Sequence, residues 1–273
     1  MKRRRTTGAQ LSFEGTGIHS GERSSVKILP LAEDRGICFR FGKSTYSIAE
    51  ARHTETRRRT TVTFPGGETL GTVEHLLAAL VGLGIDDALI EAASGSEIPI
   101  LDGSALPFAQ SIAEATVEKE NQSDSLNLPV TVSIDGGASS VVALPSGEFR
   151  ITYVTDYPGT LGTEMKDVSI TPESFLRDIA PARTFGLASE AEALRSAGLA
   201  RGASEDNTII IGDDASHRER YRLDRECAAH KVLDLLGDLA LAGATIRAHY
   251  ICVRGGHDLH SRLVNRLRTY AGK

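Results

Sequence analysis

The chain has 273 residues, of which 40% are hydrophobic and 25% are charged, as in ordinary globular proteins. No apolar run is long enough for a membrane helix, which argues against stable membrane insertion. The formal net charge of -5 argues against a surface devoted to nucleic acid.

The amino terminus is basic but is followed by polar residues, so we expect no signal peptide. Cys38, Cys227 and Cys252 lack the spacing of a disulfide framework or a thiolate zinc site. These features predict a cytoplasmic protein.

Two basic clusters, residues 2–5 and 57–59, are interpreted as solvated charge because no aromatic residues are interleaved. A phosphate-bearing small molecule would suit them equally well.

The first half opens with strands and continues into helices. Turn signals bound expected strands over residues 9–13, 25–29 and 36–41. A helix is expected over 73–81, with Thr72 as its N-cap. A strand over 87–92, a turn at 102–104 and a helix over 106–117 follow.

The second half repeats this order. Strands are expected over 130–134, 140–144 and 149–154, then a short helix capped by Thr171, a helix over 225–241, a strand over 245–253, a turn at 255–257 and a helix over 259–267. Each half is therefore a set of strands followed by helix, strand, turn and helix.

This repetition predicts an α+β fold of two similar α/β sandwich domains, each a sheet packed by helices. The domains are expected at residues 1–120 and 129–273, joined by a polar linker at 121–128. If their helical layers face each other, the active site lies at the domain interface.

A possible metal site lies on the second long helix. His230 and Asp234 are four residues apart, so both side chains project from one helical face. Asp238 continues that face and could orient a ligand or a catalytic histidine. Taken alone, a His and Asp pair at this spacing is more often a surface ion pair.

Glu74 and His75 offer a third ligand with a carboxylate beside it. His75 could bind a metal while Glu74 acts as general base, although Glu74 could equally be a favourable acid in a first helical turn. Two histidines and one aspartate leave an open position on zinc, the arrangement of a catalytic site for amide or ester hydrolysis. His257, after two glycines, is a candidate general acid or an ordinary turn residue.

These residues belong to longer segments that resemble the bacterial UDP-3-O-acyl-N-acetylglucosamine deacetylase family, zinc enzymes of lipid A synthesis. The resemblance runs nearly end to end. The segments that carry it are residues 15–21, 72–76, 97–104, 182–186, 230–234, 237–239 and 255–257.

The resemblance implies two α+β domains with the active site between them. It implies zinc on His75, His230 and Asp234, with Glu74 as base and His257 as acid beside Asp238. It also implies that Thr184 stabilises the oxyanion, and that Lys231 and Phe185 contact the nucleotide sugar. The substrate would be a nucleotide-sugar glycolipid precursor, and acetate the product; we expect a monomer and no nucleic-acid partner.

Some positions depart from the family pattern. His260 stands where asparagine is common, and Arg59 where many members have cysteine; both are expected near the cleft. The segment 157–166 is shorter than the corresponding segment of the family. Residues 187–199 are expected to form an alanine-rich helix.

The alternative function is that of a paralogue that deacetylates, or only binds, a different nucleotide sugar or acylated amino sugar. The ligand types also accept Fe²⁺.

Overall fold

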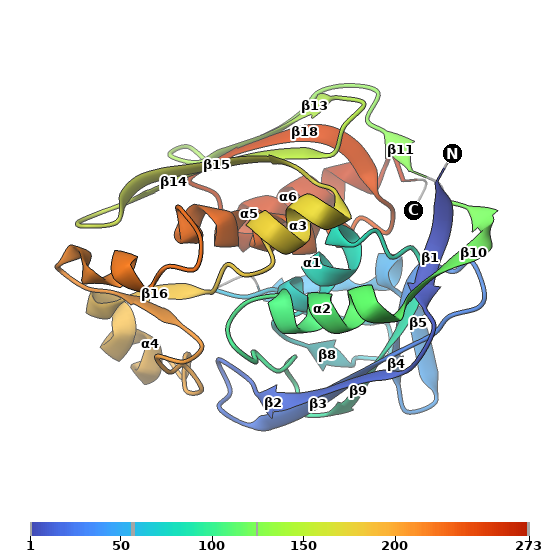
Figure 1. The fold of residues 1–273 in the computed structure, drawn as a ribbon, viewed down its shortest axis with the longest axis horizontal. Helices are drawn as coiled ribbons and strands as arrows, with labels where there is room; N and C mark the ends of the chain where they lie inside the picture. Colours follow the sequence, from blue (N-terminus) through green and yellow to red (C-terminus); the bar gives the residue numbers. More distant parts are fainter. Residues whose placement is uncertain (1, 56–57, 124, 272–273) are drawn as a thin grey trace.

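The computed structural model describes residues 2–55, 58–123 and 125–271. Two mixed sheets lie on opposite sides of the molecule, and the longer helices lie between them (Figure 1). Among the described residues, no helix combines the length and the apolar character that crossing a bilayer requires.

The first sheet is built by the first half of the chain. Across the sheet its strands are β2 (Leu11–Thr16), β3 (Arg23–Leu29), β9 (Ala88–Ser94), β4 (Ile37–Phe41) and β5 (Ser44–Ser47). The β9 and β4 strands are parallel, and the other neighbours are antiparallel.

The second sheet has the same topology. Its order is β12 (Val132–Asp135), β13 (Ser140–Pro145), β18 (Ile246–Val253), β14 (Arg150–Tyr157) and β15 (Gly162–Ser169). Here too the third and fourth strands, β18 and β14, are parallel and the other neighbours antiparallel. In the first sheet β9 lies between β3 and β4, and in the second sheet β18 lies between β13 and β14. The predicted α+β class with two similar halves is thereby confirmed.

The helices α1 (Glu74–Gly82) and α2 (Leu106–Ala115) of the first half and α3 (Pro172–Asp178), α5 (Glu226–Ala240) and α6 (His257–Leu267) of the second lie between the two sheets (Figure 1). The short helix α4 (Ala191–Ser196) lies apart from them near β16 and has no buried residue (Figure 1). Short 3-10 helices lie at Ile48–Glu50, Ala188–Glu190 and Ala215–Arg220. Leu77 of α1 and Leu233 of α5 are fully buried, because both helices lie in the core between the sheets.

Smaller sheets complete the fold. They pair β1 (Arg3–Thr7) with β10 (Thr116–Gln122), β6 (Arg52–Glu55) with β7 (Thr61–Thr63) and β8 (Thr69–Leu70), and β16 (Phe185–Leu187) with β17 (Ile209–Ile211). Strand β11 (Leu126–Asn127), within the proposed linker, pairs with β18. The division into domains at 121–128 stays a proposal.

The two halves meet where α1 crosses α5 at Gly237. A Cβ atom built on Gly237 would lie only 2.1 Å from the carbonyl oxygen of Glu74. Any larger residue would force the helices apart. The glycine therefore sets how closely the residues on α1 and α5 approach each other.

Two expectations need correction, and one strand of the second sheet was missed. Thr72 is not an N-cap: its backbone has a φ of 54°, and its hydroxyl donates to Glu97 at 2.6 Å, a partner 25 residues away. Helix α2 ends at Ala115, because the next residues pair with β1. Strand β15 was not predicted. In contrast, Thr171 caps α3 as expected and accepts from the Ser174 amide at 3.1 Å.

The interpretation of residues 2–5 as solvated charge is wrong for Arg4. Its guanidinium donates two hydrogen bonds to the buried Asp87 carboxylate, at 2.8 and 2.7 Å, and its side chain is only 12% exposed. In the second cluster Arg58 forms an ion pair with Glu190 at 2.8 Å. Arg57 lies outside the described residues.

Candidate metal centre and active site

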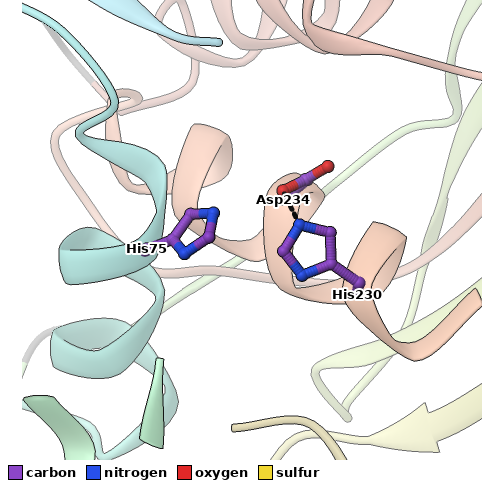
Figure 2. A group of neighbouring side chains, drawn as sticks. All are labelled: His75, His230 and Asp234. Atoms are coloured by element: carbon purple, nitrogen blue, oxygen red, sulfur yellow. Dashed lines mark ion pairs between the residues drawn. The ribbon is translucent and has the colours of Figure 1, made fainter. Parts of the chain in front are cut away.

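Three potential metal ligands meet beside the helix crossing. His75 comes from α1, and His230 and Asp234 come from α5 (Figure 2). One ligand atom of each lies within 4.8 Å of the other two, and all three side chains are buried. The structure thus brings together residues from both halves that were predicted as one ligand set.

The two imidazoles are neutral near physiological pH. Burial, supported by His230, lowers the pKa of His75 to about 3, and burial lowers the pKa of His230 as well. His230 Nδ1 lies 3.1 Å from the Ala182 carbonyl oxygen, which only accepts hydrogen bonds. Nδ1 must therefore carry the proton, and the lone pair of Nε2 faces Asp234 Oδ1 at 3.3 Å.

Asp234 is held as a carboxylate. Burial would raise its pKa, but Lys231 and then His230 outweigh burial and hold the pKa well below its usual range. The Lys231 ammonium donates to Asp234 Oδ2 at 2.6 Å and lies 5.6 Å from the centre of the Phe185 ring. One Asp234 oxygen is thus engaged by Lys231, and the other faces His230.

This donor set fits a divalent transition metal. Two neutral imidazoles and one carboxylate are the ligands of catalytic zinc sites that keep a position open. Two acceptors face each other in the cluster, because His230 carries its proton on Nδ1 and its Nε2 atom lies 3.3 Å from the Asp234 carboxylate. Two facing lone pairs repel each other unless a cation binds both, so the protein alone does not satisfy the cluster.

Glu74 lies beside these ligands at the first turn of α1. Its Oε2 atom accepts from the Thr60 amide at 3.2 Å. Burial, with Asp238 and Asp234 nearby, raises the pKa of Glu74 to about 8 against the opposing effect of His257. A cation on the neighbouring ligands would lower that pKa again, since positive charge favours the carboxylate.

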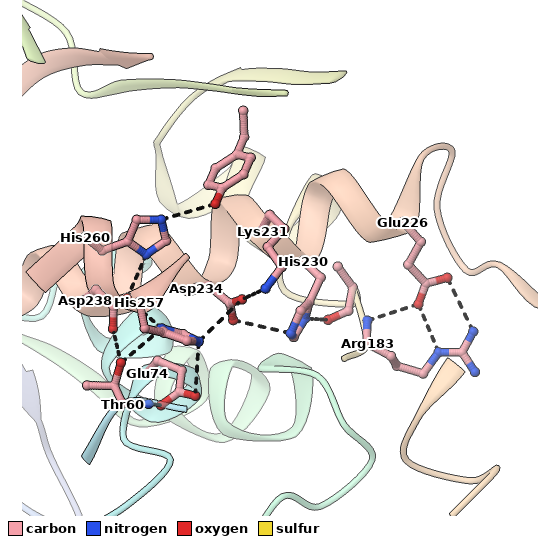
Figure 3. Close-up of polar contacts among 12 residues, drawn as sticks. Thr60, Glu74, Arg183, Glu226, His230, Lys231, Asp234, Asp238, His257 and His260 are labelled. Atoms are coloured by element: carbon pink, nitrogen blue, oxygen red, sulfur yellow. Dashed lines mark hydrogen bonds and ion pairs between the residues drawn. The ribbon is translucent and has the colours of Figure 1, made fainter. Parts of the chain in front are cut away.

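His257 is the first residue of α6 and is oriented by Asp238 (Figure 3). Its Nδ1 atom lies 2.8 Å from Asp238 Oδ2, and its Nε2 atom lies 3.9 Å from both Glu74 and Asp234. Burial would lower the pKa of His257, but Asp238 and the other carboxylates raise it to about 9. The protonated form of His257 is therefore stabilised, and this residue lines the cleft described below.

Thr60 connects the two carboxylates and was not singled out from the sequence. Its hydroxyl donates to Asp238 Oδ1 at 2.5 Å while its amide donates to Glu74. Thr60 directly follows Arg59, and the family pattern at this place drew attention to Arg59 rather than to Thr60. Only the fold brings it next to residues that are far away in the chain.

Glu226 was also missed. The buried Glu226 carboxylate accepts from the Arg183 amide at 3.0 Å and from Arg183 Nε at 2.9 Å (Figure 3). This pair holds the segment that supplies the Ala182 carbonyl to His230. Glu226 lies four residues before His230, and that spacing was the available signal for a shared helical face.

A cleft of about 420 Å³ opens over the ligand cluster. Its lining includes the predicted residues Glu74, His75, Thr184, Phe185, His230, Lys231, Asp234 and His257, together with His19, Arg58, Leu187, Leu194, Ala200 and Ala203. Of the predicted site residues, Asp238 does not line it and lies behind His257. His260 and Arg59 do not line it either: His260 contacts Asp238, and Arg59 approaches Glu97 at 3.9 Å.

The family model described as UDP-3-O-acyl N-acetylglycosamine deacetylase matches residues 4–269. The chain belongs to this family. It is a family of metalloenzymes, in agreement with the ligand cluster.

Several relatives carry the name UDP-3-O-acyl-N-acetylglucosamine deacetylase. The protein of Trichormus variabilis is 37% identical over 272 residues, covering 96% of this chain and 97% of its own. That of Geobacter sp. (strain M21) is 35% identical over 270 residues, covering 96% and 88%. That of Leptospira biflexa is 36% identical over 262 residues, covering 94% and 86%. The similarity therefore extends over both halves.

Proposed function

We propose that this chain is a metal-dependent amidohydrolase that removes the acetyl group from UDP-3-O-acyl-N-acetylglucosamine and releases acetate, an early step of lipid A synthesis. The observation that carries the proposal is the convergence of three ligands, a carboxylate and a histidine on one cleft. Family membership supports the substrate class.

The metal proposed at His75, His230 and Asp234 is Zn²⁺, with Fe²⁺ as the alternative that the same ligands accept. When bound, zinc would supply Lewis acidity toward the acetyl carbonyl and toward water. Lys231 neutralises part of the Asp234 charge and limits how strongly that carboxylate repels an anionic substrate. The protein is proposed to act as a monomer.

Glu74 is proposed as the general base. It takes a proton from the attacking water as the water oxygen forms its bond to the acetyl carbon. The Thr60 amide holds one Glu74 oxygen, so the other is directed toward the cleft. A carboxylate fixed in this way needs little rearrangement to accept the proton.

His257 is proposed as the general acid. As the carbon–nitrogen bond breaks, the protonated ring gives its Nε2 proton to the glucosamine nitrogen, which leaves as an amine. Asp238 accepts from Nδ1 at 2.8 Å and so directs Nε2 into the cleft. Thr184, whose amide donates to the Gly103 carbonyl at 2.8 Å, is proposed to donate its hydroxyl to the oxyanion.

The rest of the cleft suits the remainder of the substrate. Phe185 offers a ring face and Lys231 a cation for the nucleotide sugar. Leu187, Leu194 and the alanines near them give the cleft an apolar side suited to an acyl chain.

The decisive experiment is mass spectrometry of the products formed by the zinc-loaded protein. The panel contains UDP-3-O-acyl-N-acetylglucosamine with several acyl lengths and unacylated UDP-N-acetylglucosamine. We expect loss of acetyl from the acylated members only. Loss from the unacylated sugar would assign a different substrate, and binding without acetate release, with zinc content verified, would overturn the enzymatic proposal.

A further inference from the structure

A second imidazole is bonded to the carboxylate that orients His257. His260 lies three residues after His257 on α6, so both side chains face α5. The Nδ1 atoms of both rings lie 2.8 Å from the same atom, Asp238 Oδ2 (Figure 3). His260 is fully buried and does not line the cleft.

The direction of these hydrogen bonds follows from the charge on Asp238. Burial would raise its pKa, but His257 and His260 outweigh burial and hold the pKa well below its usual range. An ionised carboxylate only accepts, so both imidazole Nδ1–H groups and the Thr60 hydroxyl donate to it. Asp238 thus has three donors that come from two parts of the chain.

The far side of His260 is attached to the second sheet. Its Nε2 atom lies 3.2 Å from the hydroxyl of Tyr153 on β14, and the two rings are perpendicular. Tyr153 is itself fully buried. A continuous line of contacts therefore runs from the sheet through His260 and Asp238 to His257.

We propose that His260 is a positioning residue for the acid side of the site: it fixes the Asp238 carboxylate in the orientation that directs His257 Nε2 into the cleft. An aspartate carboxylate rotates easily about its last torsion. With Thr60 on one oxygen and His260 on the other, that rotation is blocked. The role rests on the proposed function, because the group being positioned is the proposed general acid.

Two substitutions of His260 distinguish a role in positioning the Asp238 carboxylate from a role in filling space in the core. Asparagine places its amide nitrogen the same number of bonds from the backbone as histidine Nδ1, so His260→Asn keeps a donor for Asp238 and loses the contact with Tyr153. The glutamine side chain reaches the position of histidine Nε2, so His260→Gln keeps the contact with Tyr153 and loses the hydrogen bond to Asp238. Glutamine is nearer to histidine in volume, so a filling role would make it the better-tolerated variant.

The test measures kcat and KM of the zinc-loaded variants with UDP-3-O-acyl-N-acetylglucosamine. We expect His260→Gln to lower kcat by about 10–100-fold with KM little changed, the usual cost of losing an outer partner of a site residue. His260→Asn should retain a much higher kcat. Wild-type kcat in both, or a lower kcat for asparagine than for glutamine, would overturn the proposal.

A second readout does not depend on turnover. The imidazole N–H proton that His257 donates to Asp238 can be followed by NMR with ¹⁵N-labelled histidine and assigned by its absence in His257→Ala. We expect the signal to persist in His260→Asn and to shift or vanish in His260→Gln. If the wild type released no acetate, the proposed function would fail, and this signal would still decide the positioning role; identical spectra for both variants would contradict it.

Discussion

The two halves of the molecule share one topology but contribute unequally to the site. The first half supplies Glu74 and His75 from α1. The second half supplies His230, Asp234 and Asp238 from α5 and His257 from α6. The same order of strands and helices therefore carries the proposed base and one proposed ligand in one half, and two proposed ligands and the proposed acid in the other.

The turn before the last helix of each half shows the difference most clearly. In the second half this turn leads into His257, which faces the cleft. In the first half it contains Asp102, which forms an ion pair with Arg222 of the other half at 2.6 Å. One turn serves the proposed chemistry and the other ties the halves together, so a repeated fold does not imply repeated roles.

Removing a ligand from either half should have the largest effect. His75→Ala and His230→Ala each leave two ligands, so we expect loss of bound zinc and of acetate release, by more than the 10–100-fold typical of outer partners. Metal analysis after dialysis measures the first and product analysis the second. His249→Ala, on the outer face of β18, is the matched control. Full zinc retention by either ligand variant would refute the shared centre.

Glu74→Gln should remove the proposed base without removing a metal ligand. We expect kcat to fall by about 10²–10⁴-fold, the usual contribution of a general base, while zinc content stays at the wild-type level. Glutamine retains an oxygen that can accept from the Thr60 amide. A rate close to wild type would show that Glu74 is only an acid at a helix start.

Gly237→Ala should weaken the contact between the halves. Its new methyl group would meet the Glu74 carbonyl, so we expect unfolding free energy to fall by about 1–3 kcal/mol and zinc affinity to fall with it. Urea denaturation and zinc titration measure these two changes. Gly147→Ala is the control, because among the described residues no heavy atom beyond its two chain neighbours lies within 4 Å of a Cβ there. Equal stability of the two variants would mean that the crossing adjusts at no cost.

Asp102→Asn should have the smallest effect. The Asp102–Arg222 pair is partly exposed, with side chains 29% and 34% accessible, so we expect a loss of about 0–1 kcal/mol in unfolding free energy. Turnover should be unchanged, in contrast to His257→Ala. A large loss of turnover would show that the turn of the first half also acts on the site.

Local patterns predicted the elements whose partners are near in sequence. The apolar run of α1 and the Thr171 cap of α3 are examples, because their causes lie within one turn of the helix. Thr72 was assigned wrongly because its hydroxyl has a better partner, Glu97, that only the fold brings near. The alternating burial of β15 follows from its pairing with β14 and was overlooked in a polar segment.

The residues of the site could likewise be grouped from the sequence only where they lie near one another in the chain. His230 and Asp234 share a helical face, so their spacing was sufficient to group them. The residues alone offered His75 as a third ligand but left the ordinary reading open, since no local pattern joins α1 to α5, and the family resemblance then favoured the ligand. Thr60 acts through hydrogen bonds to residues distant in sequence, so no spacing pointed to it. Glu226 shares a helical face with His230, but its partner Arg183 is distant in sequence, so the spacing alone did not give it a role.

The origin of the ligands in two halves has a consequence for the unfolded chain. The ion's ligands lie in distant parts of the sequence, and bringing such parts together costs an unfolded chain conformational entropy. It would also favour the native state by mass action, because the unfolded chain lacks the assembled ligands. Removing the metal should therefore lower the melting temperature of the whole molecule, in addition to stopping its chemistry.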